Sequence, residues 1–259
     1  MISGCNFLTT EAREEPSSAS SNQGRAEGAT EDVSDRDVQA LVKPSPVMGE
    51  ITEDTDVYAT AEGQAAAGSL EEGAEVEIIM DRGYQWYYVK DIRTGQTGWV
   101  SPESLSIPPD PSTNKDRMSV DELETYINEG DFDSDTPYLV WVDIDRQLTH
   151  VFEGGAGEWD LLKTLECSTG ENISPTLRGI FTLEERGEWF YSPRFESGGK
   201  YWVRYSGSYL FHSVAMNADQ TIQDPTVGKR ASAGCIRLPV EGAKWFYETV
   251  SFGSKVFIY

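Results

Sequence analysis

From residue 47 onwards this sequence consists of short runs of β-forming residues separated by polar turns. This pattern limits the chain to folds that are built mainly from strands. The longest unbroken apolar run is Tyr138–Val142, which is far shorter than a membrane-spanning helix requires. We therefore predict a mostly β protein. Its 259 residues suggest one or two domains with a sizeable core.

The net charge of −23 is unevenly distributed and divides the chain into four segments. Residues 1–46 are rich in Ser, Glu, Ala and Gly and are predicted to be a disordered tether. Residues 47–107 carry −9 and are predicted to form a small β-barrel. Residues 108–136 carry −7 and are predicted to be a linker with a short helix. Residues 137–259 carry only −3 and are predicted to form the second domain.

The composition also excludes several classes of function. An excess of acids disfavours binding to nucleic acids and to anionic lipids, both of which need clustered Lys and Arg. Two histidines and three cysteines form no close-spaced set of metal ligands, and no Gly-rich phosphate loop is present. We therefore expect neither a metal nor a cofactor, and no disulfide scaffold.

Two helices and several strands can be placed from local signals. Ser119 and Glu122 form a capping box that predicts a spacer helix to about Ile127, and a second helix is predicted after Pro239. Alternating residues predict a hairpin over 138–152, and we expect a second hairpin that joins 179–183 to 189–191.

Cys235 is the candidate nucleophile. Small residues precede it in Ala-Ser-Ala-Gly-Cys-Ile-Arg, residues 231–237, so that a carbonyl group can approach the sulfur and backbone amides can face it. Arg237 follows it, and the cations Lys229 and Arg230 lie upstream. A thiol needs a base at neutral pH because its ordinary pKa is about 8.5.

His212 is the better candidate for this base, because it ends a strand-like run from which a loop leads to Cys235. His150 lies within a predicted hairpin strand and is expected to be structural or exposed. Cys167 shares a strand face with Leu165 and is expected to be a buried apolar residue.

Several separated motifs from Tyr138 to the end of the chain resemble the L,D-transpeptidase (YkuD-type) catalytic domain. They are Phe-His-Ser at 211–213, Gly228, Ser-Ala-Gly-Cys-Ile-Arg-Leu at 232–238, and Cys-Ser-Thr-Gly at 167–170 with the later Gly-Ile-Phe at 179–181. The chain departs from the family pattern at Ala233, where the family usually has His, and in a longer gap between His212 and Ser232.

The resemblance implies a β-sandwich-like domain that acts on peptidoglycan stem peptides. Cys235 would form a thioester at the third stem residue, and His212 would move the proton while the Ser213 carbonyl holds its imidazole. Gly234 and Ser232 would contribute to the oxyanion and substrate site, and Arg237 would bind a carboxylate or fix the loop. An amine acceptor would give links between third-position residues, whereas water would make the protein an L,D-carboxypeptidase. The sequence does not choose between them, and a monomer is expected.

The segment 47–107 resembles the bacterial SH3 domain, most specifically in the closing Gly-Gln-Thr-Gly-Trp-Val of 95–100. This resemblance implies a wall-targeting module and an extracytoplasmic location in the cell envelope. Trp86, Tyr87 and Trp99 could line a ligand groove, but we expect them to be core aromatics of the barrel. At the start of the chain, Ile2-Ser-Gly-Cys5 resembles the end of a lipoprotein signal, which would make Cys5 a lipid anchor.

Two other interpretations compete with a cross-linking enzyme. NlpC-type endopeptidases are also joined to bacterial SH3 domains, but their Cys precedes their His along the chain, opposite to the order here. A non-catalytic wall-binding protein of the same fold would use the SH3-like domain alone. The presence of Cys235, His212 and Arg237 favours an active enzyme.

Overall fold

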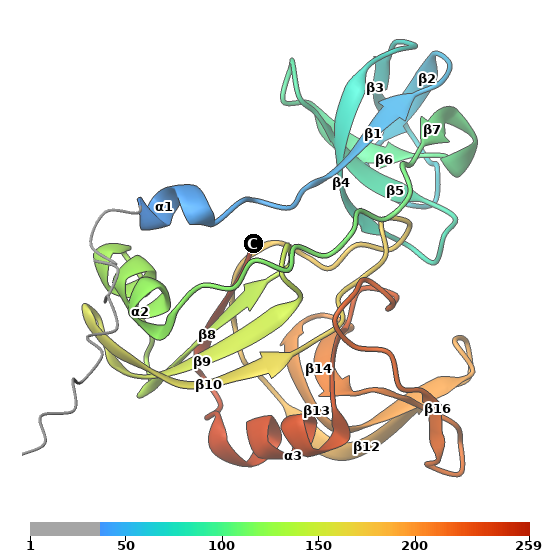
Figure 1. Cartoon of the computed structure of the whole chain (residues 1–259). Helices are drawn as coiled ribbons and strands as arrows, with labels where there is room; N and C mark the ends of the chain where they lie inside the picture. The colour runs from blue at the N-terminus through green and yellow to red at the C-terminus, as the bar shows by residue number, and fades with distance from the viewer. Residues whose placement is uncertain (1–36) are drawn as a thin grey trace, which may run out of the picture. The chain divides into compact units, whose positions relative to one another are not determined.

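The computed structural model describes residues 37–259 (Figure 1). The first sheet, which we call sheet A, has seven strands in the order β3-β2-β6-β5-β4-β1-β7. They are β1 (Val47–Ile51), β2 (Thr55–Tyr58), β3 (Ala66–Leu70), β4 (Glu75–Asp81), β5 (Tyr87–Asp91), β6 (Thr97–Val100) and β7 (Leu105–Ser106), with a 3₁₀ turn η2 (Pro102–Ser104) before β7. All its pairings are antiparallel, and alternate residues such as Val76 and Ile78 are buried in its own core.

The aromatic residues of sheet A correct one expectation. Tyr87 is buried in the core, but Trp86 and Trp99 are only partly buried and lie outside it. Trp86 packs edge-on against Tyr58, and Trp99 packs against Tyr88. Tyr87 is the first residue of β5 and faces the core, whereas Trp86 precedes the strand and Trp99 lies on the other face of β6 from the buried Val100.

Residues 1–46 were predicted to be a tether. Of these, residues 1–36 lie outside the described part of the chain. From Asp37 the chain is ordered, because Asp37 caps a short helix, α1 (Val38–Leu41). Val38 and Val42 are buried in a cluster with Leu123 and Trp141. The expectation of disorder is therefore wrong for 37–46, since two valines four positions apart pack against the C-terminal part of the chain.

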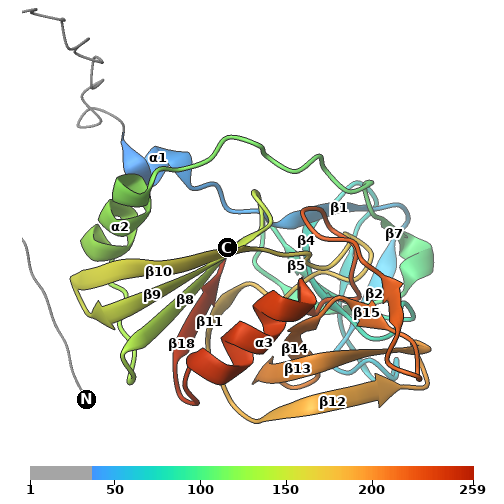
Figure 2. The ribbon, with the colours of Figure 1, turned by 60° about the horizontal axis from the view of Figure 1, so that its bottom comes forward.

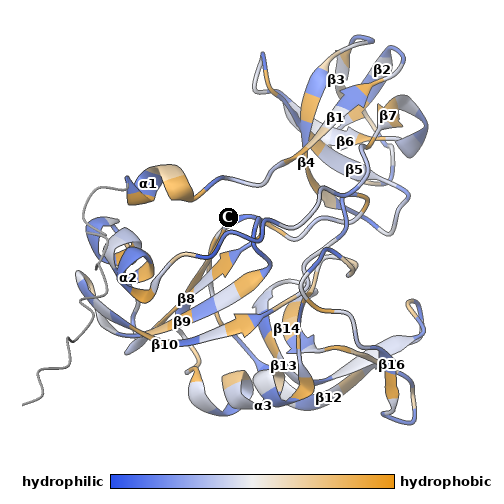
Figure 3. Ribbon diagram, viewed as in Figure 1, coloured by the Kyte–Doolittle hydropathy of each residue, from blue (hydrophilic) through white to orange (hydrophobic). Residues whose placement is uncertain are grey.

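The predicted spacer helix is part of a core rather than a free spacer. It is α2 (Val120–Glu129), it begins with the expected capping box of Ser119 and Glu122, and Gly130 is its C-cap. Its apolar side, with Tyr126 and Ile127, packs in the same cluster as α1. Figure 3 shows that both helices carry hydrophobic residues among hydrophilic ones, which is typical of helices that cover a sheet.

These two helices cover one face of a five-stranded sheet, sheet B, with the order β10-β9-β8-β18-β11. Its strands are β8 (Tyr138–Asp143), β9 (Leu148–Gly155), β10 (Glu158–Glu166), β11 (Gly179–Thr182) and β18 (Lys255–Ile258). Along β8, Leu139 and Trp141 face the helices, whereas Val140 and Val142 face the main core. Burial of both faces explains why this strand has the longest apolar run of the chain.

The other side of the main core is formed by sheet C, with strand order β16-β15-β13-β14-β17 and with β12 paired to β13. The strands are β12 (Arg186–Ser192), β13 (Ser197–Ser206), β14 (Tyr209–Ser213), β15 (Ala215–Met216), β16 (Ile222–Asp224) and β17 (Ile236–Leu238). Helix α3 (Val240–Thr249) follows β17 as predicted and lies along β13 and β14 (Figure 2). Phe211, Ile236 and Phe246 pack in this core with residues of sheet B.

The expected second hairpin is wrong. β11 pairs with β18 at the edge of sheet B, whereas β12 pairs with β13 in sheet C. The short polar segment between β11 and β12 therefore joins two sheets rather than two paired strands. Contacts group residues 37–259 into one unit, in which no helix is long and apolar enough to cross a membrane.

Candidate active site

Parallel pairing of two short strands places the candidate residues on one face of sheet C. In the register of β14 and β17, Phe211 lies opposite Ile236 and His212 lies opposite Arg237. Phe211 and Ile236 point into the core, so His212, Arg237 and the preceding Cys235 point to the other face. There all three line one cavity of about 310 Å³.

The imidazole of His212 is held in one tautomer. Its Nδ1 atom lies 2.6 Å from the carbonyl oxygen of Ser213. A carbonyl can only accept a hydrogen bond, so Nδ1 carries the proton and Nε2 keeps its lone pair. The Ser213 hydroxyl is itself fixed, because it accepts from Lys200 N and donates to Val214 O, each at 2.9 Å.

Packing fixes the position of the same ring. The ring of Phe190 meets the imidazole edge-on, with centroids 5.1 Å apart. Gly199 lies on β13 beside the ring, and a Cβ atom there would overlap Nδ1 and lie 3.0 Å from Cγ of His212. Gly199 is therefore needed for the close approach of the backbone to the imidazole.

Burial lowers the pKa of His212 to about 3, and the positive charge of Arg237 adds to this effect while the Ser213 carbonyl opposes it. Burial likewise raises the pKa of the Cys235 thiol. The hydrogen bond from the Leu210 backbone and the positive charges of Arg237 and Arg204 act in the opposite direction and lower it. Both side chains are therefore neutral near pH 7. The two side chains therefore do not form an ion pair with each other near pH 7.

The loop that carries Cys235 is fixed by hydrogen bonds to its backbone. Ser232 Oγ donates to the carbonyl oxygen of Cys235 at 2.5 Å, and Thr176 Oγ1 donates to that of Gly234 at 2.8 Å. Gly234 has a φ of +94°, and a Cβ atom there would lie 2.6 Å from Cε1 of Tyr209. This position therefore requires glycine for both its backbone conformation and the space around it.

Residues 168–170 lie beside the loop that carries Cys235, and the turn between β8 and β9 anchors them. Gln147 Nε2 donates to Thr169 Oγ1 at 2.7 Å, and Gln147 Oε1 accepts from Thr169 N at 2.8 Å. The adjacent Ser168 exchanges two backbone hydrogen bonds of 2.8 Å with Arg237. The turn thus fixes residues 168 and 169, which lie beside β17, the strand that follows Cys235.

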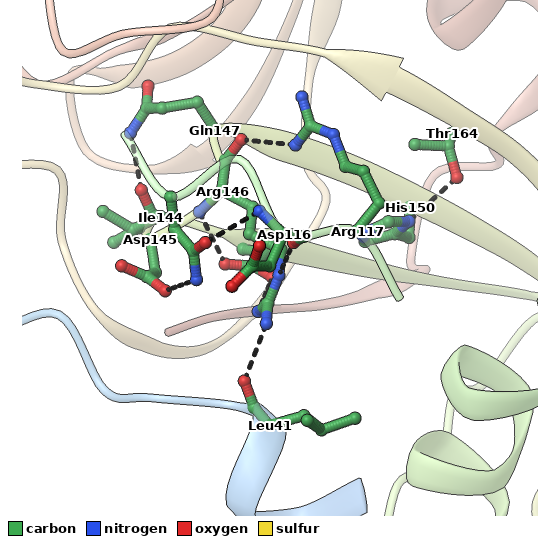
Figure 4. Close-up of polar contacts among 11 residues, drawn as sticks. Leu41, Asp116, Arg117, Ile144, Asp145, Arg146, Gln147, His150 and Thr164 are labelled. Atoms are coloured by element: carbon green, nitrogen blue, oxygen red, sulfur yellow. Dashed lines mark hydrogen bonds and ion pairs between the residues drawn. The ribbon is translucent and has the colours of Figure 1, made fainter. Parts of the chain in front are cut away.

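Arg146 is the neighbour of Gln147 in this turn, and it binds two other segments of the chain. It forms a buried 2.9 Å ion pair with Asp143 and donates to the carbonyl oxygens of Leu41 and Asp116 at 2.9 and 2.7 Å (Figure 4). The end of α1 at Leu41 and the segment before α2 at Asp116 are therefore tied to the same turn. Single removal of either charge would leave the other buried and unpaired.

Arg237 is already paired. Its guanidinium donates to Asp224 Oδ2 at 3.0 Å, and only 15% of its side chain is exposed. Asp224 was not singled out in the sequence, because nothing in its neighbourhood distinguishes it from the other acids of the chain. The ion pair ties β16 to β17, so Arg237 holds the loop in addition to facing the cavity.

Two other basic residues that the sequence places near Cys235 are not in this cavity. Arg230 donates to Asn172 Oδ1 at 2.6 Å and lines a separate cavity with Arg178, and Lys229 is exposed.

His150, the other histidine, also lies outside this cavity. It is 1% exposed, its Nδ1 lies 2.9 Å from Thr164 Oγ1, and burial lowers its pKa to about 3 (Figure 4). Cys167 is fully buried in the main core, as expected.

The cavity is lined by further residues that the sequence did not indicate, among them Tyr84 from sheet A and Glu171. Ala233, the departure from the family pattern, lines it as well. Within residues 37–259, no three His, Cys, Asp or Glu side chains are grouped closely enough to hold a metal ion. The cavity also holds a thiol and a neutral imidazole, those of Cys235 and His212.

The C-terminal part of the chain is similar to known proteins. Residues 137–258 match the family model of YkuD, the L,D-transpeptidase catalytic domain. The curated protein "Putative L,D-transpeptidase YciB" of Bacillus subtilis (strain 168) is 38% identical over 130 residues, which cover 46% of this chain and 65% of that protein.

Two solved structures are also similar. One is described as a fused Zn-dependent amidase/peptidase/peptidoglycan-binding domain-containing protein from Clostridium acetobutylicum. It is 30% identical, with a TM-score of 0.46, and the match covers 57% of this chain and 65% of that one. The other is an L,D-transpeptidase from Stackebrandtia nassauensis, 19% identical, with a TM-score of 0.41 and coverage of 53% and 65%. This chain thus spans about 65% of the length of each of these relatives.

Proposed function

We propose that the protein cross-links peptidoglycan stem peptides through an acyl thioester on Cys235, and the match of residues 137–258 to the family model of the L,D-transpeptidase catalytic domain supports this. The observation that carries this proposal is the position of two side chains in one cavity: a partly exposed thiol, and an imidazole whose Nε2 is left free by the Ser213 hydrogen bond. A thiol and a neutral base in one cavity are the minimum for nucleophilic acyl transfer.

In the first step, the Cys235 sulfur attacks the carbonyl carbon of the third stem residue while His212 Nε2 takes the thiol proton. The carbonyl oxygen becomes an oxyanion, which the backbone amides of Gly234 and Cys235 would stabilise. The bond to the terminal D-alanine then breaks, and the departing amine takes the proton from the imidazolium. Because His212 is buried, its charged form is disfavoured, so the imidazole is a weaker base toward the thiol and a stronger acid toward the leaving amine.

In the second step, the thioester is resolved by the side-chain amine of another stem peptide, which gives a link between two third-position residues. Water at the same place would release the shortened stem and make the protein an L,D-carboxypeptidase. We propose the transpeptidase because the family of the domain is named for that reaction. Such an enzyme acts outside the cytoplasm, on the cell wall. In this proposal the SH3-like segment and the lipid anchor at Cys5 would keep it there.

The test is covalent labelling followed by product analysis. A carbapenem, as an acylating β-lactam, should add its mass to the wild-type protein, and Cys235→Ala should abolish the adduct. With stem tetrapeptides, the wild type should release one D-alanine for each dimer formed, and the dimer should keep the D-alanine of the acceptor. An unmodified wild type that still binds wall fragments would instead identify a non-catalytic wall-binding protein. Shortened stems without dimers would identify the carboxypeptidase.

A further inference from the structure

One side chain that lines the cavity comes from outside residues 137–259. Tyr84 lies in the turn between β4 and β5 of sheet A and lines the same cavity as Cys235, His212 and Glu171. Tyr84 is 42% exposed and has a φ of +62°, a conformation that a bulky residue adopts only where its surroundings hold it. The turn therefore has a defined place at the mouth of the cavity.

Specific contacts hold this turn against the loop of residues 168–178. Asp81 Oδ2 accepts from the backbone amide of Tyr84 at 2.8 Å, and Asp81 Oδ1 accepts from Ser174 Oγ at 2.5 Å. Nearby, Tyr87 Oη donates to the carbonyl oxygen of Ile173 at 3.1 Å. The loop that carries Glu171 and the turn that carries Tyr84 thus share one set of hydrogen bonds.

Most of the charged side chains around Tyr84 are carboxylates. Glu171 forms no ion pair within residues 37–259, and its carboxylate, with that of Asp81, lies close enough to raise the pKa of the Tyr84 hydroxyl beyond the effect of burial. Arg194 is also near Tyr84, but two carboxylates outnumber it. Elsewhere in the cavity, Arg237 is neutralised by Asp224 and His212 is uncharged. The free charge of the cavity is therefore the carboxylate of Glu171.

We propose that Glu171 and Tyr84 bind the cationic side-chain amine of the acyl acceptor, so that sheet A contributes to the choice of acceptor. The proposal rests on the proposed transpeptidase function. The two stem peptides differ in the charge that they bring: the leaving end of the donor is a carboxylate, which Glu171 would repel, whereas the acceptor brings an ammonium group. A carboxylate and a phenol oxygen are both acceptors for the hydrogen bonds of an ammonium group.

The chemical step balances with groups already present. The bound ammonium first loses one proton to water, and the neutral amine attacks the thioester carbon. The new C–N bond forms and the C–S bond breaks, and the second proton leaves the nitrogen through His212 to the Cys235 sulfur. Glu171 is thus a binding residue that raises the local concentration of the amine, and Tyr84 orients it; neither needs to exchange a proton.

The experiment separates the acceptor from the donor. With the full chain, cross-linking of stem peptides is measured by mass spectrometry as a function of each peptide's concentration, next to carbapenem acylation. Glu171→Gln should raise the KM for the acceptor about tenfold, as expected for loss of a charged hydrogen bond, and much more than the KM for the donor. Tyr84→Phe should raise it about twofold to fivefold. The matched control is Glu158→Gln, which removes the same charge from an exposed position of β10 outside the cavity.

An acceptor KM in Glu171→Gln equal to that of Glu158→Gln would overturn the proposal and leave the proposed function intact, because acylation and cross-linking would continue. A wild type that carbapenem does not acylate would overturn the function itself and the proposal with it. Ionic strength gives a further readout. Raising the salt concentration should increase the acceptor KM of the wild type more than that of Glu171→Gln.

Discussion

The contact between Gly199 and the imidazole of His212 predicts that one added methyl group will disable the proposed base. Gly199→Ala would place Cβ closer to Nδ1 than the sum of their van der Waals radii allows, and 3.0 Å from both Cγ of His212 and Cε1 of Phe190. The backbone at Gly199 has no positive φ, so alanine brings no conformational strain of its own. The effect must therefore come from displacement of the ring.

The size of the effect follows from the size of the overlap. To recover ordinary contact the imidazole must retreat by about 1 Å, and an error of that size in a catalytic group costs on the order of 100-fold in rate. The retreat also strains the 2.6 Å hydrogen bond from Nδ1 to the Ser213 carbonyl. We therefore expect the rate of acylation by a carbapenem to fall about 100-fold, with the thiol itself still present and reactive toward a small alkylating reagent.

The measurement is the time course of the mass adduct under single-turnover conditions, with thermal unfolding as a check on folding. Gly155→Ala is the matched control, because a Cβ atom at Gly155 would meet no atom within 4 Å. It should acylate at the wild-type rate. If Gly199→Ala acylated as fast as Gly155→Ala, the imidazole would not be the base, and the mechanism proposed for this cavity would be refuted.

Three further predictions follow from the same structure. Gly234→Ala, which combines a φ of +94° with the 2.6 Å approach to Tyr209, should abolish acylation while unfolding remains cooperative; an active variant would show that the loop does not have to keep this shape. Asp224→Asn should lower the free energy of unfolding by about 1 kcal/mol or less and lower the donor's KM, because it frees Arg237 for a carboxylate; a raised KM would contradict this. The two buried histidines, each with a pKa of about 3, bind fewer protons when folded than at their unfolded value of about 6.5, so stability should fall as pH drops below about 6.5. That loss should be about 5 kcal/mol by pH 4.5 in urea titrations, and His150→Gln should remove about half of it; equal pH dependence in the two proteins would refute the assignment.

The parts of the fold that could be predicted depend on local signals. The capping box of Ser119 and Glu122, the β8–β9 hairpin and the start of α3 after Pro239 each follow from residues a few positions apart. The α2 helix was located correctly, but its role was not. Its apolar residues indicate that it covers something, and only the tertiary structure shows that this is sheet B.

Strand pairing was predicted least well, because the pattern within a strand does not identify its partner. β11 was expected to pair with the next strand along the chain, yet it pairs with β18 at the other end of the domain. The residues that line the cavity could likewise be predicted only in part. Cys235 and His212 stand out by residue type, whereas Tyr84, Glu171 and Asp224 are ordinary surface residues until the fold brings them to one place.

The distribution of charge can be reinterpreted from burial. Residues 137–259 carry a net charge of only −3, and the family resemblance implied that Arg237 binds a carboxylate or fixes the loop. In the structure, the central strand β8 of sheet B is buried on both faces, whereas the edge strand β10 carries exposed acids such as Glu158. Among the described residues that line the cavity, Arg237 is the one cation, and Asp224 already neutralises it. The remaining carboxylate, Glu171, gives the site a net negative charge, which suits an incoming amine better than a second carboxylate.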